Sequence, residues 1–399
     1  MKNKILTITV LSLISVLSFS MIIQPFSSYG NVVLVKEDMT ALLKVGAFAD
    51  IELSQNFLTM DNLNALLNEE ELIINTETMK SAINNGLKAF FNANAGTYAH
   101  LNLFGFRFVP YLRIDGNLSL SIPKTVSNIL FGETNIGETN ESTVTNFLKT
   151  NITMNLGSSI VFEKFYVGVN LYSPIAFSDQ NSTYAYAYYT SSASPSYAEL
   201  NIQAQARILS SYNLNNIENE IFNFQNSGIS LELGFGTDNF GIAVRNITIS
   251  PAKATYVIAI RSDGKVNYTA EGTNLTLDAT YNIYNSPLSY LTEPVNVIPP
   301  IQITGYFKGQ NPLMWGVAGS YWLDGNWMAK GYAGFNLGLL KLYYMLGMNP
   351  AGYAHTIGFG FNLFFANADL KLTATTDQFI PIGQTTPGIG IAFTFSGGL

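Results

Sequence analysis

Charged side chains are scarce in this chain, so the charged residues that recur at even spacing are the first candidates for chemistry. Arg107, Arg113 and Asp115 all occupy odd positions within one alternating segment. Side chains two residues apart in an extended strand share a face, so the three would line up on one side. We therefore predict that they form a constriction or a solute-contacting patch.

Further charged residues fall on the polar faces of other alternating segments. The remaining candidates of this kind are Glu199, Arg207, Glu232, Lys330, Asp369 and Lys371. A ring of like charges would indicate ion selectivity. Both signs occur here, so the simpler interpretation of any single residue is a salt-bridged, hydrogen-bonded interior that satisfies buried charge. On either interpretation these side chains, together with Asp50 and Glu52 of the alternating segment 44–54, are expected to point into a lumen.

Catalysis is not predicted. A phospholipase or protease site needs a His with a carboxylate or Ser partner, and the two His residues, His100 and His355, are expected on a polar face and at a rim. Neither Gly-x-Ser-x-Gly nor His-Glu-x-x-His occurs. The absence of Cys excludes thiolate metal sites and Cys nucleophiles. The sequence thus predicts no enzyme activity, no cofactor and no metal site.

The composition is typical of a protein whose surface is not all in water. Only 12% of the 399 residues are charged, against about 25% in soluble domains. After residue 30, no apolar run approaches the roughly 20 residues of a helical membrane span. Low charge without helical spans indicates a membrane β-barrel. The net charge of -7 argues against nucleic acid as a partner.

Strict alternation of apolar and polar residues predicts the elements that would position the charged side chains. It is clearest over residues 44–54, 151–162, 199–209 and 367–375. Between residues 265 and 284 the phase of the alternation flips. A slip of one residue would turn every side chain to the wrong face, so the flip predicts a tight hairpin turn at Gly272-Thr273-Asn274.

Turns and connections differ in length in a way that is typical of bacterial barrels. Tight turns are predicted at 238–239, 324–326 and 366–367, and long polar connections at 125–149, 178–197 and 213–226. In such barrels short turns face the periplasm and long loops face outward. We predict an all-β fold, a transmembrane antiparallel up-and-down β-barrel of about 16 strands within a range of roughly 14 to 18.

Aromatic residues cluster near the predicted turns, as interfacial girdles of a membrane barrel would require. The clusters are Tyr184, Tyr186, Tyr188 and Tyr189, then Trp315, Tyr321, Trp322, Trp327 and Tyr332, then Tyr343 and Tyr344. A soluble β-sandwich also alternates and is the competing fold. Its water-facing surface would carry more charge than the Gly-, Asn-, Ser- and Thr-rich polar faces of this chain.

Two segments near the start depart from the strand pattern. Residues 1–30, with Lys2 and Lys4 before an apolar stretch, have the layout of a secretory signal peptide, and an uncleaved anchor is the alternative. The remaining residues 31–399 are expected to form a single barrel. Residues 56–88 show helical spacing and predict a short amphipathic insertion, either a lumen plug, a rim element or a surface loop.

The last strand resembles the closing strand of bacterial outer-membrane β-barrel proteins. That family ends with a glycine followed three and five positions later by apolar residues, which the barrel-assembly machinery reads as an insertion signal. Gly390, Phe393 and Phe395 match this spacing. The resemblance implies export to the bacterial outer membrane, with membrane lipid and the assembly machinery as partners.

The early helical insertion is similar, in architecture only, to that of the fatty-acid transporter group. The function expected from these patterns is an outer-membrane channel or transporter for passive or facilitated passage of small solutes. The alternative is a structural or surface-interaction barrel with a plugged lumen. A small-molecule solute and a homo-oligomer are compatible with both, and the sequence does not identify the solute.

Overall fold

The computed structural model describes the chain in fourteen ranges: residues 43–56, 86–103, 106–131, 137–162, 164–193, 196–220, 222–237, 239–271, 274–285, 288–309, 313–363, 366–376, 379–380 and 388–398. The described part is almost entirely antiparallel β-sheet, and its twenty strands form one sheet. Its helices are short, and none of them is long and apolar enough to cross a membrane.

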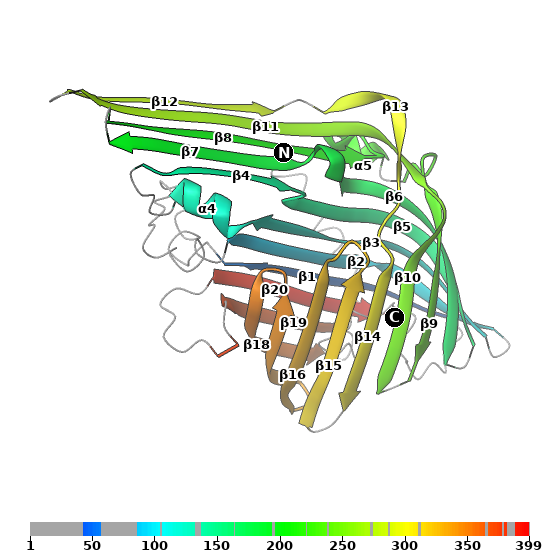
Figure 1. Cartoon of the computed structure of the whole chain (residues 1–399). Coiled ribbons are helices and arrows are strands. Elements are labelled where there is room, and N and C mark those ends of the chain that lie inside the picture. Colours follow the sequence, from blue (N-terminus) through cyan, green and yellow to red (C-terminus); the bar gives the residue numbers. More distant parts are fainter. Residues whose placement is uncertain are drawn as a thin grey trace.

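Fourteen of the strands close into a ring in which each strand pairs antiparallel with the next. The last of them, β20, pairs with β1 and completes the circle (Figure 1). Within the ring, strands follow one another in chain order, as in an up-and-down barrel. In ring order they are β1 (Leu43–Gln55), β2 (Leu87–Leu103), β3 (Phe106–Ile122), β5 (Leu148–Phe162), β6 (Phe165–Ser178), β9 (Gly228–Gly236), β10 (Phe240–Ser250), β14 (Gln302–Gly309), β15 (Leu313–Trp322), β16 (Trp327–Asn336), β17 (Leu340–Asn349), β18 (Gly352–Leu363), β19 (Ala366–Thr376) and β20 (Gly388–Gly398).

The two ends of the ring differ in the length of the connections between strands. At one end, where β1 begins and β20 finishes, consecutive strands are joined by two or three residues. We call this the short-turn end. At the other, long-connection end, the chain after β3, β6 and β10 builds further secondary structure before it returns. The asymmetry predicted from the turn residues is therefore present, but not at every predicted position. Residues 324–326 join β15 to β16 at the long-connection end, residues 366–367 begin β19, and the connection predicted over 178–197 contains the strand Tyr184–Ala193.

The six strands outside the ring form a second part of the same sheet, which we call the extension. It consists of β4 (Thr139–Thr145), β7 (Tyr184–Ala193), β8 (Ser196–Ser210), β11 (Ala252–Glu271), β12 (Asn274–Asn285) and β13 (Ser289–Val297). Strands β4, β7, β8, β11 and β12 lie side by side in that order. In Figure 1 the long strands β7, β8, β11 and β12 run together across the top of the view.

Short helices accompany the extension. Helix α4 (Lys124–Phe131) packs Val126 and Ile129 onto Ala187 of β7. The 3₁₀ turns η3 (Gln180–Ser182) and η4 (Leu214–Asn216) and the single-turn helix α5 (Ile217–Glu220) flank β7 and β8. Helix α4 gives the extension a covered face and leaves the opposite face open.

The strands of the ring carry apolar side chains outside, and their charged and most of their polar side chains inside. On β1, Ile51 and Leu53 are exposed while Asp50, Glu52 and Ser54 are buried. On the outer face of β15, Val317 is 56% exposed. This is the reverse of a water-soluble sheet, in which the apolar face is the buried one. Period-two alternation along each strand produces both faces at once.

The predicted strands are found, and their predicted number is not confirmed. The alternating segments 44–54, 151–162, 199–209 and 367–375 lie within β1, β5, β8 and β19, and Glu271 pairs with Asn274 at the predicted hairpin. The ring has fourteen strands rather than about 16, because β8 and the β11–β12 hairpin belong to the extension.

The predictions near the N-terminus fall mostly outside the described residues. This holds for the signal peptide, residues 1–30, and for most of the helical insertion, residues 56–88. At the end of that insertion Leu87 and Lys88 lie in β2, so the helical spacing was wrongly extended to them. Helix α4 lies further along the chain. It follows β3, in the segment 125–149 that is predicted as a long polar connection.

The aromatic clusters serve different purposes in the structure. Tyr321 and Tyr344 are about half exposed on the outer face of the ring. Trp322 and Tyr332, in contrast, are buried inside it. The tyrosines of residues 184–189 lie on β7, so the prediction that they belong to a girdle around the barrel is wrong.

Candidate functional site

Four ionisable side chains meet inside the ring and form what we call the central charge cluster: Arg113, Asp115, Glu232 and Arg245. All four are at least nine-tenths buried. Each arginine contacts both carboxylates, because Arg113 binds Asp115 at 2.7 Å and also Glu232, while Arg245 lies 2.5 Å from Asp115 and 3.4 Å from Glu232. The cluster is therefore charge-balanced within itself.

The ring positions these groups from three strands. Arg113 and Asp115 are adjacent inward positions on β3, Glu232 is on β9 and Arg245 is on β10. Since β5, β6 and β9 stand between β3 and β10 in the ring, the Arg245 to Asp115 contact crosses the interior. Arg245 sits where the pairing of β10 with β9 shifts register, beside Asn246, whose φ is +61°. The irregularity re-aims the strand at the cluster.

Polar neighbours hold the cluster in place. Gln302 of β14 accepts a hydrogen bond from Arg245 at 3.2 Å, and Asn155 of β5 donates to Asp115 at 3.3 Å. The guanidinium of Arg113 also lies over the ring of Tyr111, 4.7 Å from its centroid. The backbones of β2 and β3 lie close together here, because a Cβ added to Gly96 of β2 would lie 2.7 Å from the Cα of Arg113. A glycine is thus needed opposite the arginine.

A second group of charges, which we call the lysine cluster, lies on the strands around the ring closure: Asp50, Glu52, Lys330, Lys341, Asp369 and Lys371. Lys330 of β16 binds Glu52 of β1 across the interior, and Lys371 of β19 lies 3.6 Å from Asp50. Asp369 interacts with Lys341 and Lys371. Three lysines here face three carboxylates, so this cluster is also balanced.

Uncharged side chains also meet across the interior of the ring. Phe90 of β2 joins Met314, Tyr332 and Tyr343 of the opposite wall in one buried apolar group. Near the long-connection end, Asn326 forms hydrogen bonds with Ser119 and Asn117 of β3. Contacts between opposite walls bring them close together. In this conformation the described part of the interior is packed with side chains.

Six of the predicted lumen residues are buried inside the ring: Arg113, Asp115, Glu232, Lys330, Asp369 and Lys371. Arg107 is also on β3, but it lies six residues from Arg113, about 20 Å along a strand, toward the short-turn end and away from the central charge cluster. Arg207 and Glu199 lie on β8 of the extension, where they pair with Asp179 and Lys265. The structure thus does not bring these three to the cluster.

Two buried charges were missed from the candidate set. Arg245 is the fourth member of the central charge cluster, and Lys341 is 4% exposed in the lysine cluster. Alternation could have found both: Ile242 of β10 faces outward, so Arg245 must face inward, and Leu342 of β17 likewise places Lys341 inside. Of the histidines, His100 is buried on β2, and His355 on β18 contacts the hydroxyl of Tyr344 through Nδ1 at 2.6 Å.

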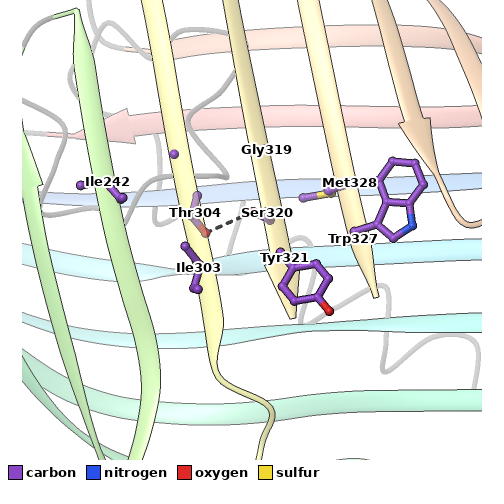
Figure 2. A pocket seen from close by; sticks show the side chains of 9 residues that line it. Ile242, Ile303, Thr304, Gly319, Ser320, Tyr321, Trp327 and Met328 are labelled. Carbon is purple, nitrogen blue, oxygen red and sulfur yellow. Dashed lines mark hydrogen bonds between the residues drawn. The ribbon is translucent and has the colours of Figure 1, made fainter. Parts of the chain in front are cut away.

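A shallow groove lies on the outer wall where β10, β14, β15 and β16 meet (Figure 2). Its volume is about 500 Å³, and its lining is almost wholly apolar. The paired glycines Gly305 and Gly319 form its floor, and Ile303, Tyr321 and Trp327 are among the residues around it. The adjacent inward pair, Thr304 and Ser320, is joined by a hydrogen bond of 3.1 Å. The groove can accept a hydrocarbon chain from outside.

Comparison with known proteins gives similarity at the level of solved structures only. No family model and no curated protein matches the chain. Among solved structures, the Pseudomonas putida toluene transporter TodX is 9% identical, with 96% of this chain and 94% of that chain covered, at a TM-score of 0.33. A Rhodopseudomonas blastica porin is 8% identical, with 90% and 100% covered, at 0.28. Acinetobacter baumannii OccAB3 is 7% identical, with 90% and 98% covered, at 0.25. All three TM-scores are below 0.5, so the proposals below are drawn from this chain's own geometry.

Proposed function

We propose that the protein is a bacterial outer-membrane transport barrel, that it passes small solutes, and that the central charge cluster is its gate. The observation that carries the proposal is a set of four fully paired charges buried inside a closed ring whose outer surface is apolar. Each half of that observation supports a separate step.

The outer surface supports a membrane location. A closed ring leaves no unpaired strand edge, which is the condition for β-structure to cross hydrocarbon. Residues such as Ile160, Val167 and Leu372 are more than half exposed on the outer wall. In water such a band would drive aggregation, whereas in a bilayer it is solvated by lipid. Lipid acyl chains are accordingly the proposed occupants of the outer wall and its groove.

The buried charges support a transport role rather than a role only in packing the interior of the barrel. Replacing a buried ion pair by apolar residues of similar size is often neutral or stabilising, so such pairs are not the most stable way to fill a barrel. Ionisable groups at membrane depth most often mark the path of an ion or solute. In Arg113 and Arg245 the ring holds two cations whose carboxylate partners a charged solute could replace.

A second function, a structural or surface-interaction barrel, is favoured by a different observation. Cross-wall contacts such as Phe90 to Tyr332 and Asn326 to Ser119 leave the described interior packed. These cross-wall contacts alone would be sufficient for a structural barrel that never opens. The transport proposal instead requires the central charge cluster to separate, so the two functions predict different behaviour when the cluster is neutralised.

Planar-bilayer recording of the full chain, refolded in detergent, tests the proposal. A variant that neutralises the cluster combines Arg113→Gln, Asp115→Asn, Glu232→Gln and Arg245→Gln. We expect sparse openings in the wild type and more frequent or longer openings in this variant, because charge pairing no longer joins β3 to β9 and β10. A folded variant as silent as the wild type would favour the structural role.

The matched control removes two charges of each sign from the extension, through Glu199→Gln, Lys265→Gln, Arg261→Gln and Asp263→Asn. These side chains are partly exposed outside the ring, so conductance is expected to stay at the wild-type level. A third variant without residues 61–85, which leaves β2 intact, tests the proposed plug. Openings that appear only after this deletion would assign the closure to the helical insertion rather than to the cluster.

The remaining parts of the proposal concern targeting and assembly. We assign export to residues 1–30 and the insertion signal to Gly390, Phe393 and Phe395, read by the barrel-assembly machinery. In support, β20 is the strand that closes the ring, with Phe393 opposite Leu370 and Ile51 in register. Leu370 and Ile51 both belong to the apolar outer wall.

A further inference from the structure

The open face of the extension has a composition unlike any other surface described above. Two neighbouring strands contribute the central rows of side chains to the face opposite helix α4. On β7 these are Tyr184, Tyr186 and Tyr188, and their direct partners on β8 are Gln205, Gln203 and Asn201. We call these six residues the tyrosine face.

The tyrosine rings stand in a regular row. Residues two apart on a strand lie about 7 Å apart on one face, so Tyr184, Tyr186 and Tyr188 form a continuous aromatic strip. All three are partly exposed. Tyrosine offers a large, rigid contact surface with little loss of side-chain entropy on binding, together with a hydroxyl at its rim. The strip is therefore suited to stacking a flat ligand.

The amide row beside the strip is held in fixed orientations. Asn201 donates to Glu199 at 2.7 Å, and Gln205 donates to the backbone oxygen of Ser182 at 3.0 Å. Gln203, between them, is exposed. A carboxamide both donates and accepts hydrogen bonds. A ligand stacked on the tyrosines would therefore meet amide groups that can donate hydrogen bonds to its hydroxyls and accept hydrogen bonds from them.

The charges around the tyrosine face are two ion pairs and one further carboxylate, Glu141 of β4, which is the register partner of Tyr188 and interacts with Tyr186. Lys265 lies 3.1 Å from Glu199, and Arg261 lies 3.2 Å from Asp263. Arg261, Asp263 and Lys265 lie in the next row of the same face, because they are the β11 register partners of Gln205, Gln203 and Asn201, and Glu199 lies two positions from Asn201 on β8. A single-stranded nucleic acid would require a net positive groove. With two balanced ion pairs and one additional carboxylate, the face has no net positive charge, so an uncharged partner fits it better than a polyanion.

We propose that the tyrosine face binds a neutral carbohydrate chain. A sugar ring presents C–H groups that stack on an aromatic surface and a rim of hydroxyls that pairs with amides, and open faces of β-sheets bind oligosaccharides in other folds. Helix α4 supports the sheet from behind through Ala187.

The position of the extension fits this ligand. It is built from the connections after β3, β6 and β10, at the long-connection end of the ring. In a barrel of the proposed kind this end faces outward, where polysaccharide is accessible. The carbohydrate inference does not depend on conductance, since the tyrosine face lies outside the ring.

Affinity electrophoresis of the full chain in detergent gels tests the inference, with dextran, pullulan and mixed-linkage β-glucan as the neutral probes. We expect at least one of them to retard the wild-type protein. Tyr186→Ala should weaken that retention about fivefold or more, the size of one aromatic stacking contact. Tyr186→Phe should retain most of it, because the ring remains. Tyr290→Ala is the matched control, since Tyr290 is 68% exposed on β13, outside the face.

The inference would be overturned by any of three results. These are no retention by the three polysaccharides, equal retention of the wild type and Tyr186→Ala, or retention by heparin and single-stranded DNA alone. If Tyr186→Ala does not fold, Gln203→Ala replaces it with the same expected loss. Unchanged bilayer conductance in Tyr186→Ala, beside lost retention, would separate this site from the proposed transport function.

Discussion

Removing one arginine from the central charge cluster is the sharpest test of its geometry. In the variant Arg245→Gln, Asp115 and Glu232 would share the single guanidinium of Arg113. Two unit charges about 4 Å apart interact by about 4 kcal/mol at an effective dielectric constant of 20, and breaking a buried pair costs about 3–5 kcal/mol in proteins. Because Arg113 still contacts both carboxylates, we expect a loss near the lower limit, about 3 kcal/mol.

Urea unfolding of the protein in lipid vesicles measures this loss. The control is Lys265→Gln, which removes one partner of an exposed pair in the extension. Exposed pairs contribute about 0–1 kcal/mol, so the control should stay close to the wild type. The second variant is Arg245→Gln with Asp115→Asn, which restores a balance of one negative and one positive charge and should recover part of the loss. The reasoning fails if Arg245→Gln is no more harmful than Lys265→Gln, or if the double variant is less stable than the single one.

Three further predictions concern other parts of the molecule. Gly96→Ala should destabilise the ring by about 1–3 kcal/mol, because its Cβ would collide with the backbone oxygen of Leu112 on β3, while Gly305→Ala, with its nearest backbone oxygen at 3.6 Å, should be near neutral in the same urea assay. Val317→Arg places a charge on the outer wall and should reduce stability by about 2–4 kcal/mol in vesicles if it lies near the bilayer midplane; the same loss in detergent-free water would contradict the membrane location. The hydrogen bond from Asn201 lowers the pKa of Glu199. The stabilisation that this bond gives the folded protein is therefore complete above about pH 4.3 and is lost as the pH falls through the lower pKa of the folded state. Asn201→Ala should raise the pKa of Glu199 in an NMR titration of its carboxyl carbon, and an unchanged pKa would refute this cause.

The sequence predicted the two faces of the strands because a period of two follows directly from extended backbone. Asp50 and Glu52 were assigned to the inner face of the first strand from Ile51 and Leu53 alone, and they are buried there. The same rule could not separate ring from extension. Strand β8 alternates as regularly as β5, and only its pairing with β7 and β11 shows that it leaves the ring.

The partners of the buried charges could not be predicted for a different reason. Asp115 and Arg245 are 130 positions apart in the chain, and their contact depends on the ring's closure and on a register shift in β10 that alternation does not encode. The mixed signs of the candidate residues did predict a salt-bridged interior as the simpler interpretation. Alternation did not predict which charged residues contact each other. Those contacts determine whether the charges join the walls of the ring or line an open path.

The pairing of β20 with β1 also constrains how the protein can be made. Residue 46 lies opposite residue 398, so the ring has no closing partner until the whole chain has been synthesised. Contacts between such distant positions are slow to form, and before closure the edges of β1 and β20 stand open to other chains. The sheet is therefore most prone to misassembly before the ring closes, and a chaperone that covers the edge of β1 would be most useful in that interval.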